Sequence, residues 1–118
     1  MLEERRDVVR AGQRAGVVYT VLPEHERQRG VTFDISGGGI GLVTQRVLAP
    51  WTELQVALQL PTREAPVHFI GQVVWSRAQE TADRAQRTRA VLTGLRISEI
   101  APDDQTELME YVVRTKMM

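Results

Sequence analysis

The chain has 118 residues, of which 42% are hydrophobic, and its 15 basic residues are balanced by 15 acidic ones. This length and composition fit a single folded domain, and the zero net charge disfavours a general nucleic-acid-binding protein or one held on an acidic membrane surface. With no cysteine and only two histidines, the sequence has almost no material for disulfides, metal cages or a nucleophile relay, so we expect no catalytic site, no metal and no cofactor.

The first 15 residues carry many charges and few apolar side chains. We expect residues 1–15 to form a mobile N-terminal segment, followed by a folded domain over residues 16–118. No apolar run suits a signal peptide or approaches the roughly 18 residues of a membrane span, which predicts a cytoplasmic protein without membrane insertion. All basic residues except Lys116 are arginine. Either a GC-rich genome or a need for planar guanidinium groups, which grip phosphate and guanine at two points, explains this excess.

Six segments have the apolar runs or the alternation of β-strands: 16–23, 30–35, 40–44, 54–60, 67–76 and 91–97. In the second segment, alternation places Val31, Phe33 and Ile35 on one face. The fourth segment alternates most clearly, as a half-buried antiparallel strand requires. Gly71 marks an expected bulge or bend in the fifth segment.

The periodicity changes after the last predicted strand. Pro102 suits the first position of a helix, and Leu108, Met109, Val112 and Val113 fall on one apolar stripe of that helix. The sequence therefore predicts a mainly β fold, a six-stranded antiparallel barrel that is closed or nearly closed, with a C-terminal helix packed across an opening.

Two connecting segments have a less certain place in this fold. Residues 77–89 are polar, with four arginines against two acids. They form either a long exposed hairpin loop or a short surface helix, and they offer a possible partner surface. Trp51 follows Pro50 in a turn, and we expect its indole to cover one end of the barrel.

The glycine-rich stretch from Asp34 to Gly41 does not match the known phosphate-binding or nucleophile motifs. The spacing of its glycines is wrong for a dinucleotide fingerprint, and no Gly-Lys-Ser/Thr follows as in a P-loop. A sharp turn between two strands remains, in which glycine permits positive φ and a close approach of another molecule. Asp34 and Ser36 point to the same side, where the carboxylate could accept the N1–H and N2–H groups of guanine. Alternatively, both side chains only cap the turn.

Two motifs occur in order along the chain. Arg6 and Arg10 form an Arg-x-x-x-Arg pattern, and Asp34, Ser36 and Gly39 form Asp-x-Ser-x-x-Gly about 25 residues later. The chain thereby resembles PilZ domains, which are bacterial receptors for cyclic di-GMP. The resemblance extends through Gly71-Gln72-Val73-Val74-Trp75, Gly94-Leu95-Arg96-Ile97 and the C-terminal helix.

The resemblance implies a loop, carrying the arginine motif, that wraps over the ligand on the outer barrel surface. The implied ligand-binding residues are Arg5, Arg6, Arg10, Asp34, Ser36, Gly38, Gly39 and Trp75. Trp75 either stacks on a base or belongs to the barrel on the face of Phe69 and Val73. Arg14, Arg77 and Arg96 could add phosphate contacts or be solvated charges only.

We therefore expect a nucleotide-binding receptor domain for cyclic di-GMP that is not an enzyme. Ligand binding would change the conformation of the N-terminal arginine loop and signal to a downstream protein partner or an attached domain, in motility or biofilm regulation. Neither DNA nor RNA is an expected partner. The alternative is a PilZ-fold interaction module that does not bind nucleotide. The oligomeric state, the ligand stoichiometry and the controlled process do not follow from the sequence.

Overall fold

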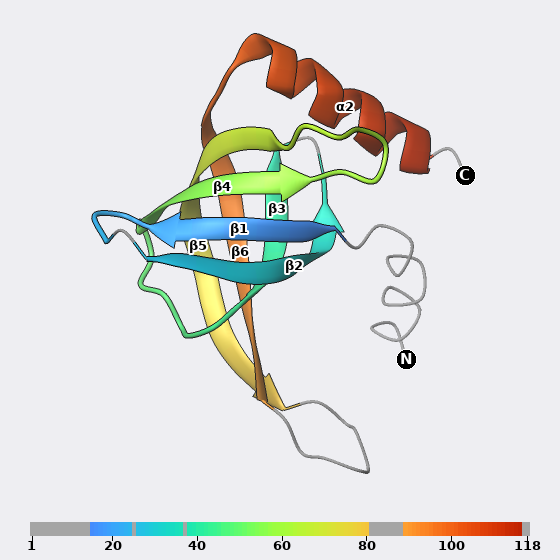
Figure 1. The fold of residues 1–118 in the computed structure, drawn as a ribbon. Helices are drawn as coiled ribbons and strands as arrows, with labels where there is room; N and C mark the ends of the chain where they lie inside the picture. Colours follow the sequence, from blue (N-terminus) through green and yellow to red (C-terminus); the bar gives the residue numbers. More distant parts are fainter. Residues whose placement is uncertain (1–14, 25, 37, 81–88, 117–118) are drawn as a thin grey trace.

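Six antiparallel strands close into a barrel, and a helix follows them at the C-terminal end (Figure 1). The computed structural model describes residues 15–24, 26–36, 38–80 and 89–116. The elements are β1 (Gly16–Val21), β2 (Arg27–Ile35), β3 (Gly39–Thr44), β4 (Glu53–Gln59), β5 (Val67–Glu80), β6 (Arg89–Ile100) and α2 (Pro102–Lys116). The strands are hydrogen-bonded in the order β1-β2-β3-β6-β5-β4, and β4 pairs with β1 to complete the ring. The predicted closed barrel with a C-terminal helix is confirmed.

Alternation of apolar side chains builds the barrel interior, most regularly along β4. Leu54, Val56 and Leu58 are at most 2% exposed, whereas the residues between them are exposed or half-buried. The other fully buried side chains include Tyr19, Leu42, Leu60, Val67, Val73 and Leu108. Because every strand pairs on both sides over its barrel portion, closure leaves few backbone groups of the barrel without partners.

The helix α2 begins at Pro102, as predicted, and packs against β5 above the barrel (Figure 1). Its buried face consists of Leu108, Tyr111 and Val112. The predicted stripe is therefore wrong at Met109 and Val113, which are exposed, because the buried face takes Tyr111 at the i+3 position instead. No helix among the described residues is long and apolar enough to cross a membrane.

The strands β5 and β6 extend beyond the barrel as a two-stranded ribbon (Figure 1). Their pairing continues from Arg77 opposite Leu92 to Glu80 opposite Arg89. Residues 77–80 and 89 are thus paired strand, so the two strands reach further than expected. The choice between a hairpin loop and a short surface helix stays a prediction for the part between them. Residues 81–88 lie outside the described residues.

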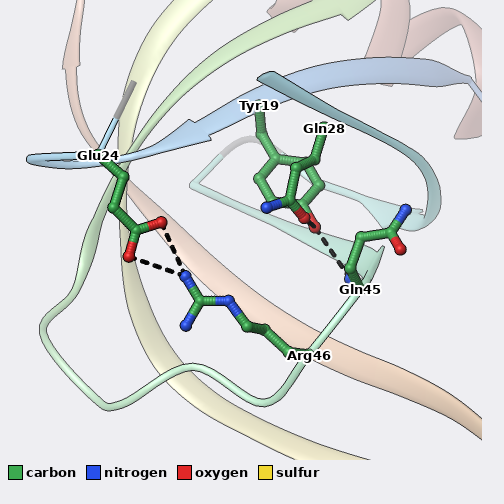
Figure 2. A network of polar contacts seen from close by, with 5 residues as sticks. All are labelled: Tyr19, Glu24, Gln28, Gln45 and Arg46. Atoms are coloured by element: carbon green, nitrogen blue, oxygen red, sulfur yellow. Dashed lines mark hydrogen bonds and ion pairs between the residues drawn. The ribbon is translucent and has the colours of Figure 1, made fainter. Parts of the chain in front are cut away.

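A buried tyrosine connects three parts of the barrel near the β1–β2 connection (Figure 2). The Tyr19 hydroxyl donates to Gln28 Oε1 and accepts from the backbone N–H of Gln45, both at 2.9 Å. Burial raises the pKa of Tyr19 above its usual 10.0, and the bond from Gln45 and the nearby Arg46 lower it by less. At the surface beside it, Arg46 Nη2 binds both carboxylate oxygens of Glu24, at 2.9 and 3.0 Å.

A chain of hydroxyl groups fastens the connection between β3 and β4 to the barrel. Thr93 Oγ1 lies 2.9 Å from Thr44 Oγ1 and 2.8 Å from Ser76 Oγ. Ser76 Oγ also accepts the backbone N–H of Leu48 at 3.1 Å. Residues 45–52 are thereby held along β5.

Trp51, which lies in this connection, does not cover the end of the barrel as expected. Its side chain is 72% exposed and its φ is 73°. The bond from Thr52 N–H to Ala49 O, at 3.2 Å, closes a turn in which Pro50 and Trp51 take the two central positions. Such a turn has the form of type II, whose third position favours glycine because φ is positive there. A bulky residue at this position costs about 1–2 kcal/mol.

Candidate ligand-binding site

A bulge in β2 turns two consecutive side chains to the outside of the barrel. Thr32 pairs with Leu42 and Asp34 pairs with Gly41, so Phe33 is the extra residue. Thr32 and Ile35 point into the core, while Phe33 and Asp34 between them are half-buried on the outer side. The expectation that Phe33 and Ile35 share a face is therefore wrong, since the extra residue reverses the alternation.

A second bulge does the same in β5. Val73 pairs with Leu95 and Trp75 pairs with Gly94, which leaves Val74 as the extra residue. Val73 is buried, whereas Val74 and Trp75 are 56% and 39% exposed. Trp75 thus does not share the inner face with Phe69 and Val73, and of the two places considered for it, the outer one is observed. A third register shift lies between Ile70 and Gly71, which pair with Glu99 and Ile97, so its extra residue is Ser98 on β6 and not a residue of β5, where the bulge was expected.

The two bulges are joined by one row of paired residues across four strands. Asp34 on β2 pairs with Gly41 on β3, Gly41 pairs with Gly94 on β6, and Gly94 pairs with Trp75 on β5. At about 4.8 Å per strand, the row spans about 14 Å of the outer surface. A carboxylate and an indole therefore stand at its two ends, with two glycines between them.

Each glycine of this row lies directly under an aromatic ring. A Cβ at Gly41 would come within 2.5 Å of Phe33 Cζ, and a Cβ at Gly94 would overlap the indole Nε1 of Trp75. The two rings lie 6.2 Å apart between centroids at an interplanar angle of 54°. Only glycine lets the rings lie this close to the sheet, so the row forms a shallow aromatic surface.

Two exposed arginines border this surface. Arg77 Cζ lies 5.2 Å from the centroid of the Trp75 ring, in a cation–π contact. Arg96, two residues after Gly94 on β6, pairs with Gly39 and with Gln72, and its Nε donates to Gln72 Oε1 at 3.1 Å. The surface thus combines aromatic faces, a carboxylate and two guanidinium groups, which suits a flat polar ring that carries phosphates.

The turn between β2 and β3 lies at the edge of this surface. Ser36 Oγ donates to Gly39 O at 2.9 Å and accepts from Gly39 N–H at 3.2 Å, while Ser36 N–H donates to the same carbonyl at 2.9 Å. None of the described glycines has a positive φ, so the expected left-handed backbone is not found at Gly38 or Gly39. A Cβ at Gly39 would instead come within 2.9 Å of Leu95 O. Ser36 therefore caps the turn, and Gly39 allows β3 and β6 to approach closely.

The N-terminal segment joins the barrel beside the first bulge. Ala15 N–H donates to Thr32 Oγ1, and Thr32 N–H donates to Ala15 O, both at 2.9 Å. The predicted site residues Arg5, Arg6 and Arg10 lie outside the described residues.

A groove lies next to this surface. It has a volume of about 1220 Å³ between α2 and the outer faces of β4 and β5, is lined among others by His68, Asp104 and the predicted site residue Gly38, and includes neither Asp34 nor Trp75. Asp104 there accepts the backbone N–H of His68 at 3.4 Å and lies 4.0 Å from Arg63.

Sequence reasoning missed Phe33, Gly41 and Gly94 as parts of this surface. Their roles depend on the strand register, because each glycine matters only through the ring opposite it. One signal for Gly94 was present in the sequence. A glycine inside a predicted strand often marks a place where another group lies close to the backbone.

Comparisons with known proteins agree with this fold. The family model of the PilZ domain matches residues 4–114. Similar solved structures include the PilZ domain with c-di-GMP of YcgR from Escherichia coli, at 15% identity and a TM-score of 0.67, covering 87% of this chain and 82% of that one. Bacillus subtilis MotI, an inhibitor of motility, has 24% identity and a TM-score of 0.66, covering 88% of this chain and 47% of its own.

MrkH of K. pneumoniae, a c-di-GMP-dependent transcription regulatory factor, has 14% identity and a TM-score of 0.73, with 89% of this chain and 47% of MrkH covered. The chain thus spans about half the length of MotI and MrkH. A search of curated protein sequences finds no significant match.

Proposed function

The chain belongs to the PilZ domain family, and from that premise we propose that it is a receptor for cyclic di-GMP, which lies on the outer surface between Asp34 and Trp75. One observation carries the proposal. The rings of Phe33 and Trp75 lie directly against the two glycines of the row of paired residues that ends at Trp75, and the carboxylate of Asp34 stands at the opposite end of that row. The N-terminal segment that carries the arginine motif joins the barrel next to that row, at Ala15.

The residues available match the chemistry of the ligand. Asp34 accepts the N1–H and N2–H donors of a guanine, and Trp75 stacks on a base, which contributes about 1–3 kcal/mol. Arg6 and Arg10, with Arg5, bind guanine O6 and N7 or a phosphodiester. Two such bidentate arginines, at about 1–3 kcal/mol each, supply a substantial part of the roughly 8 kcal/mol of micromolar binding.

The remaining predicted site residues act through the backbone. Ser36 holds the β2–β3 turn through its bonds to Gly39. Gly38 is exposed, with open space where a Cβ would stand, so a ligand can approach its backbone.

Arg77 and Arg96 border the same surface and contribute to phosphate binding.

Ligand binding acts as a switch in this proposal. The arginine loop before Ala15 closes over cyclic di-GMP and changes conformation, and the change is passed to a downstream protein partner or an attached domain. The domain is a cytoplasmic, non-catalytic effector. The process controlled in this proposal is motility or biofilm formation, and the similarity to MotI, an inhibitor of motility, supports the first of these.

Calorimetric titrations of three variants test the site. We expect Arg6→Ala and Arg10→Ala each to nearly abolish cyclic di-GMP binding, and Asp34→Ala to weaken it at least tenfold. Arg114→Ala, which removes an exposed arginine of α2, is the matched control and binds as the parent does. Thermal unfolding of the arginine variants stays close to that of the parent. If all three site variants bind like the control, the assignment is wrong even though the fold is right, and an interaction module without nucleotide becomes the better interpretation.

A further inference from the structure

The indole of Trp75 has one face against the barrel. A Cβ at Gly94 would overlap the indole Nε1 and lie 2.6 Å from Cε2 and 3.0 Å from Cδ1. These are three consecutive atoms of the five-membered ring, and because all three are this close, the backbone of Gly94 lies under the face of the ring and not beside its edge. A base can therefore stack only on the outer face of Trp75.

That outer face already carries a side chain of the protein itself. Arg77 follows Trp75 by two residues on β5, and Ser76 between them bonds to the buried Thr93, so Trp75 and Arg77 share the outer side of the strand. Arg77 Cζ lies over the indole, 5.2 Å from the ring centroid. Since Gly94 covers the inner face, this guanidinium lies on the outer one. A base that stacks on Trp75 must take its place.

The contact that holds Arg77 on the ring is weak enough to be exchanged. The side chain of Arg77 is exposed, and among the described residues the ion pairs are formed by Arg46 and Arg63 instead. A cation–π contact at an exposed site contributes less than a charge-assisted hydrogen bond to a phosphate oxygen. A phosphate beside the ring therefore draws the guanidinium away from Trp75.

The chemistry of the entering ligand decides whether this exchange is favourable. A guanine without a phosphate displaces the guanidinium and leaves it only water as a partner. The guanines of cyclic di-GMP are joined through phosphodiesters, which bring anionic oxygens to the same surface. The released guanidinium then replaces its contact with an aromatic face by charge-assisted hydrogen bonds, which its planar fork can make at two points.

We infer that Arg77 is a specificity-determining residue, which covers the outer face of Trp75 in the free protein and moves to a phosphate of the ligand when a base takes that face. The inference rests on the proposed function, because it requires a guanine that stacks on Trp75. Arg77 thereby disfavours a guanine that carries no phosphate. Arg96, the other guanidinium of this surface, bonds to Gln72 and has no such effect.

Titration of a single indole with two ligands tests the inference. In a Trp51→Phe background Trp75 is the remaining tryptophan, and its indole N–H is followed by NMR while guanosine or cyclic di-GMP is added. We expect Arg77→Ala to raise the affinity for guanosine about two- to fivefold, the ratio that corresponds to one exposed cation–π contact. The same variant should lose at least tenfold of its preference for cyclic di-GMP over guanosine, because the phosphate contact is gone.

Arg96→Ala is the matched control, since it removes a guanidinium from the same surface without uncovering Trp75. It should lower the affinity for cyclic di-GMP and not raise the affinity for guanosine. If Arg77→Ala leaves the guanosine affinity equal or lowers it while cyclic di-GMP still binds to the parent, Arg77 does not compete with the base and this inference alone is wrong. If the parent binds no cyclic di-GMP, the receptor function fails, and the inference fails with it.

Discussion

Replacing Gly94 by alanine tests whether glycine is what seats Trp75 on the barrel. The new Cβ would overlap the indole Nε1 and lie 2.6 Å from Cε2. Because Trp75 is 39% exposed, the ring can swing into solvent instead of forcing the sheet apart. The variant then loses the contact with Phe33, worth about 0.5–1.5 kcal/mol, and the contact with Arg77, worth about 0.5–1 kcal/mol.

We therefore expect Gly94→Ala to lower the free energy of unfolding by about 1–2.5 kcal/mol, measured by urea denaturation. In a Trp51→Phe background Trp75 is the remaining tryptophan of the two in the chain, and its fluorescence emission should shift to longer wavelength. Affinity for cyclic di-GMP should fall by about 5- to 150-fold, because stacking on one base contributes about 1–3 kcal/mol.

Gly16→Ala is the matched control, since nothing lies within 4 Å of a Cβ at that position of β1. It should leave the emission and the affinity unchanged and the stability equal or slightly higher. The reasoning is refuted if Gly94→Ala keeps the stability and the Trp75 emission of the parent.

Three further predictions concern other parts of the fold. Thr93→Val removes the central hydroxyl of the chain that joins Thr44 to Ser76 and should lower the free energy of unfolding by about 1–2 kcal/mol in urea denaturation; an unchanged midpoint would contradict this. Burial raises the pKa of Tyr19 above 10.0, so the folded protein keeps a proton that the unfolded chain releases. The resulting stability is fully present below pH 10 and is lost as pH rises through the higher folded pKa, and Tyr19→Phe should reduce the alkaline loss of stability in a series of urea titrations. Trp51→Gly should be more stable than Trp51→Ala by about 1 kcal/mol, because alanine retains the cost of a φ of 73°; equal thermal unfolding of the two variants would show that this backbone is not strained.

The sequence predicts those parts of the fold that alternation alone determines. Leu54, Val56 and Leu58 are buried as expected, since every second residue of β4 faces the core and no bulge interrupts it. In β2 the same rule fails after Phe33, because one extra residue in the pairing turns the rest of the strand over. That extra residue becomes visible only when the partner strand is known.

The sequence indicates the candidate site only where its motifs are local. Asp34 and Ser36 stand out in the chain itself, but the ring of Trp75 meets Gly94 only through the pairing of β5 with β6, because these two residues are 19 positions apart in the sequence. Trp51 illustrates the same limit. Pro50 indicates a turn, but the type of turn, and with it the direction of the indole, depends on the hydrogen bonds to β5.

Isothermal titration calorimetry of the unmodified protein with cyclic di-GMP, with GTP and cyclic di-AMP as controls, tests the central claim most directly. We predict selective binding of cyclic di-GMP with a dissociation constant in the low micromolar range or tighter, and the fitted stoichiometry then distinguishes one ligand from two. The absence of both binding heat and thermal stabilisation at high cyclic di-GMP concentration would contradict the receptor function.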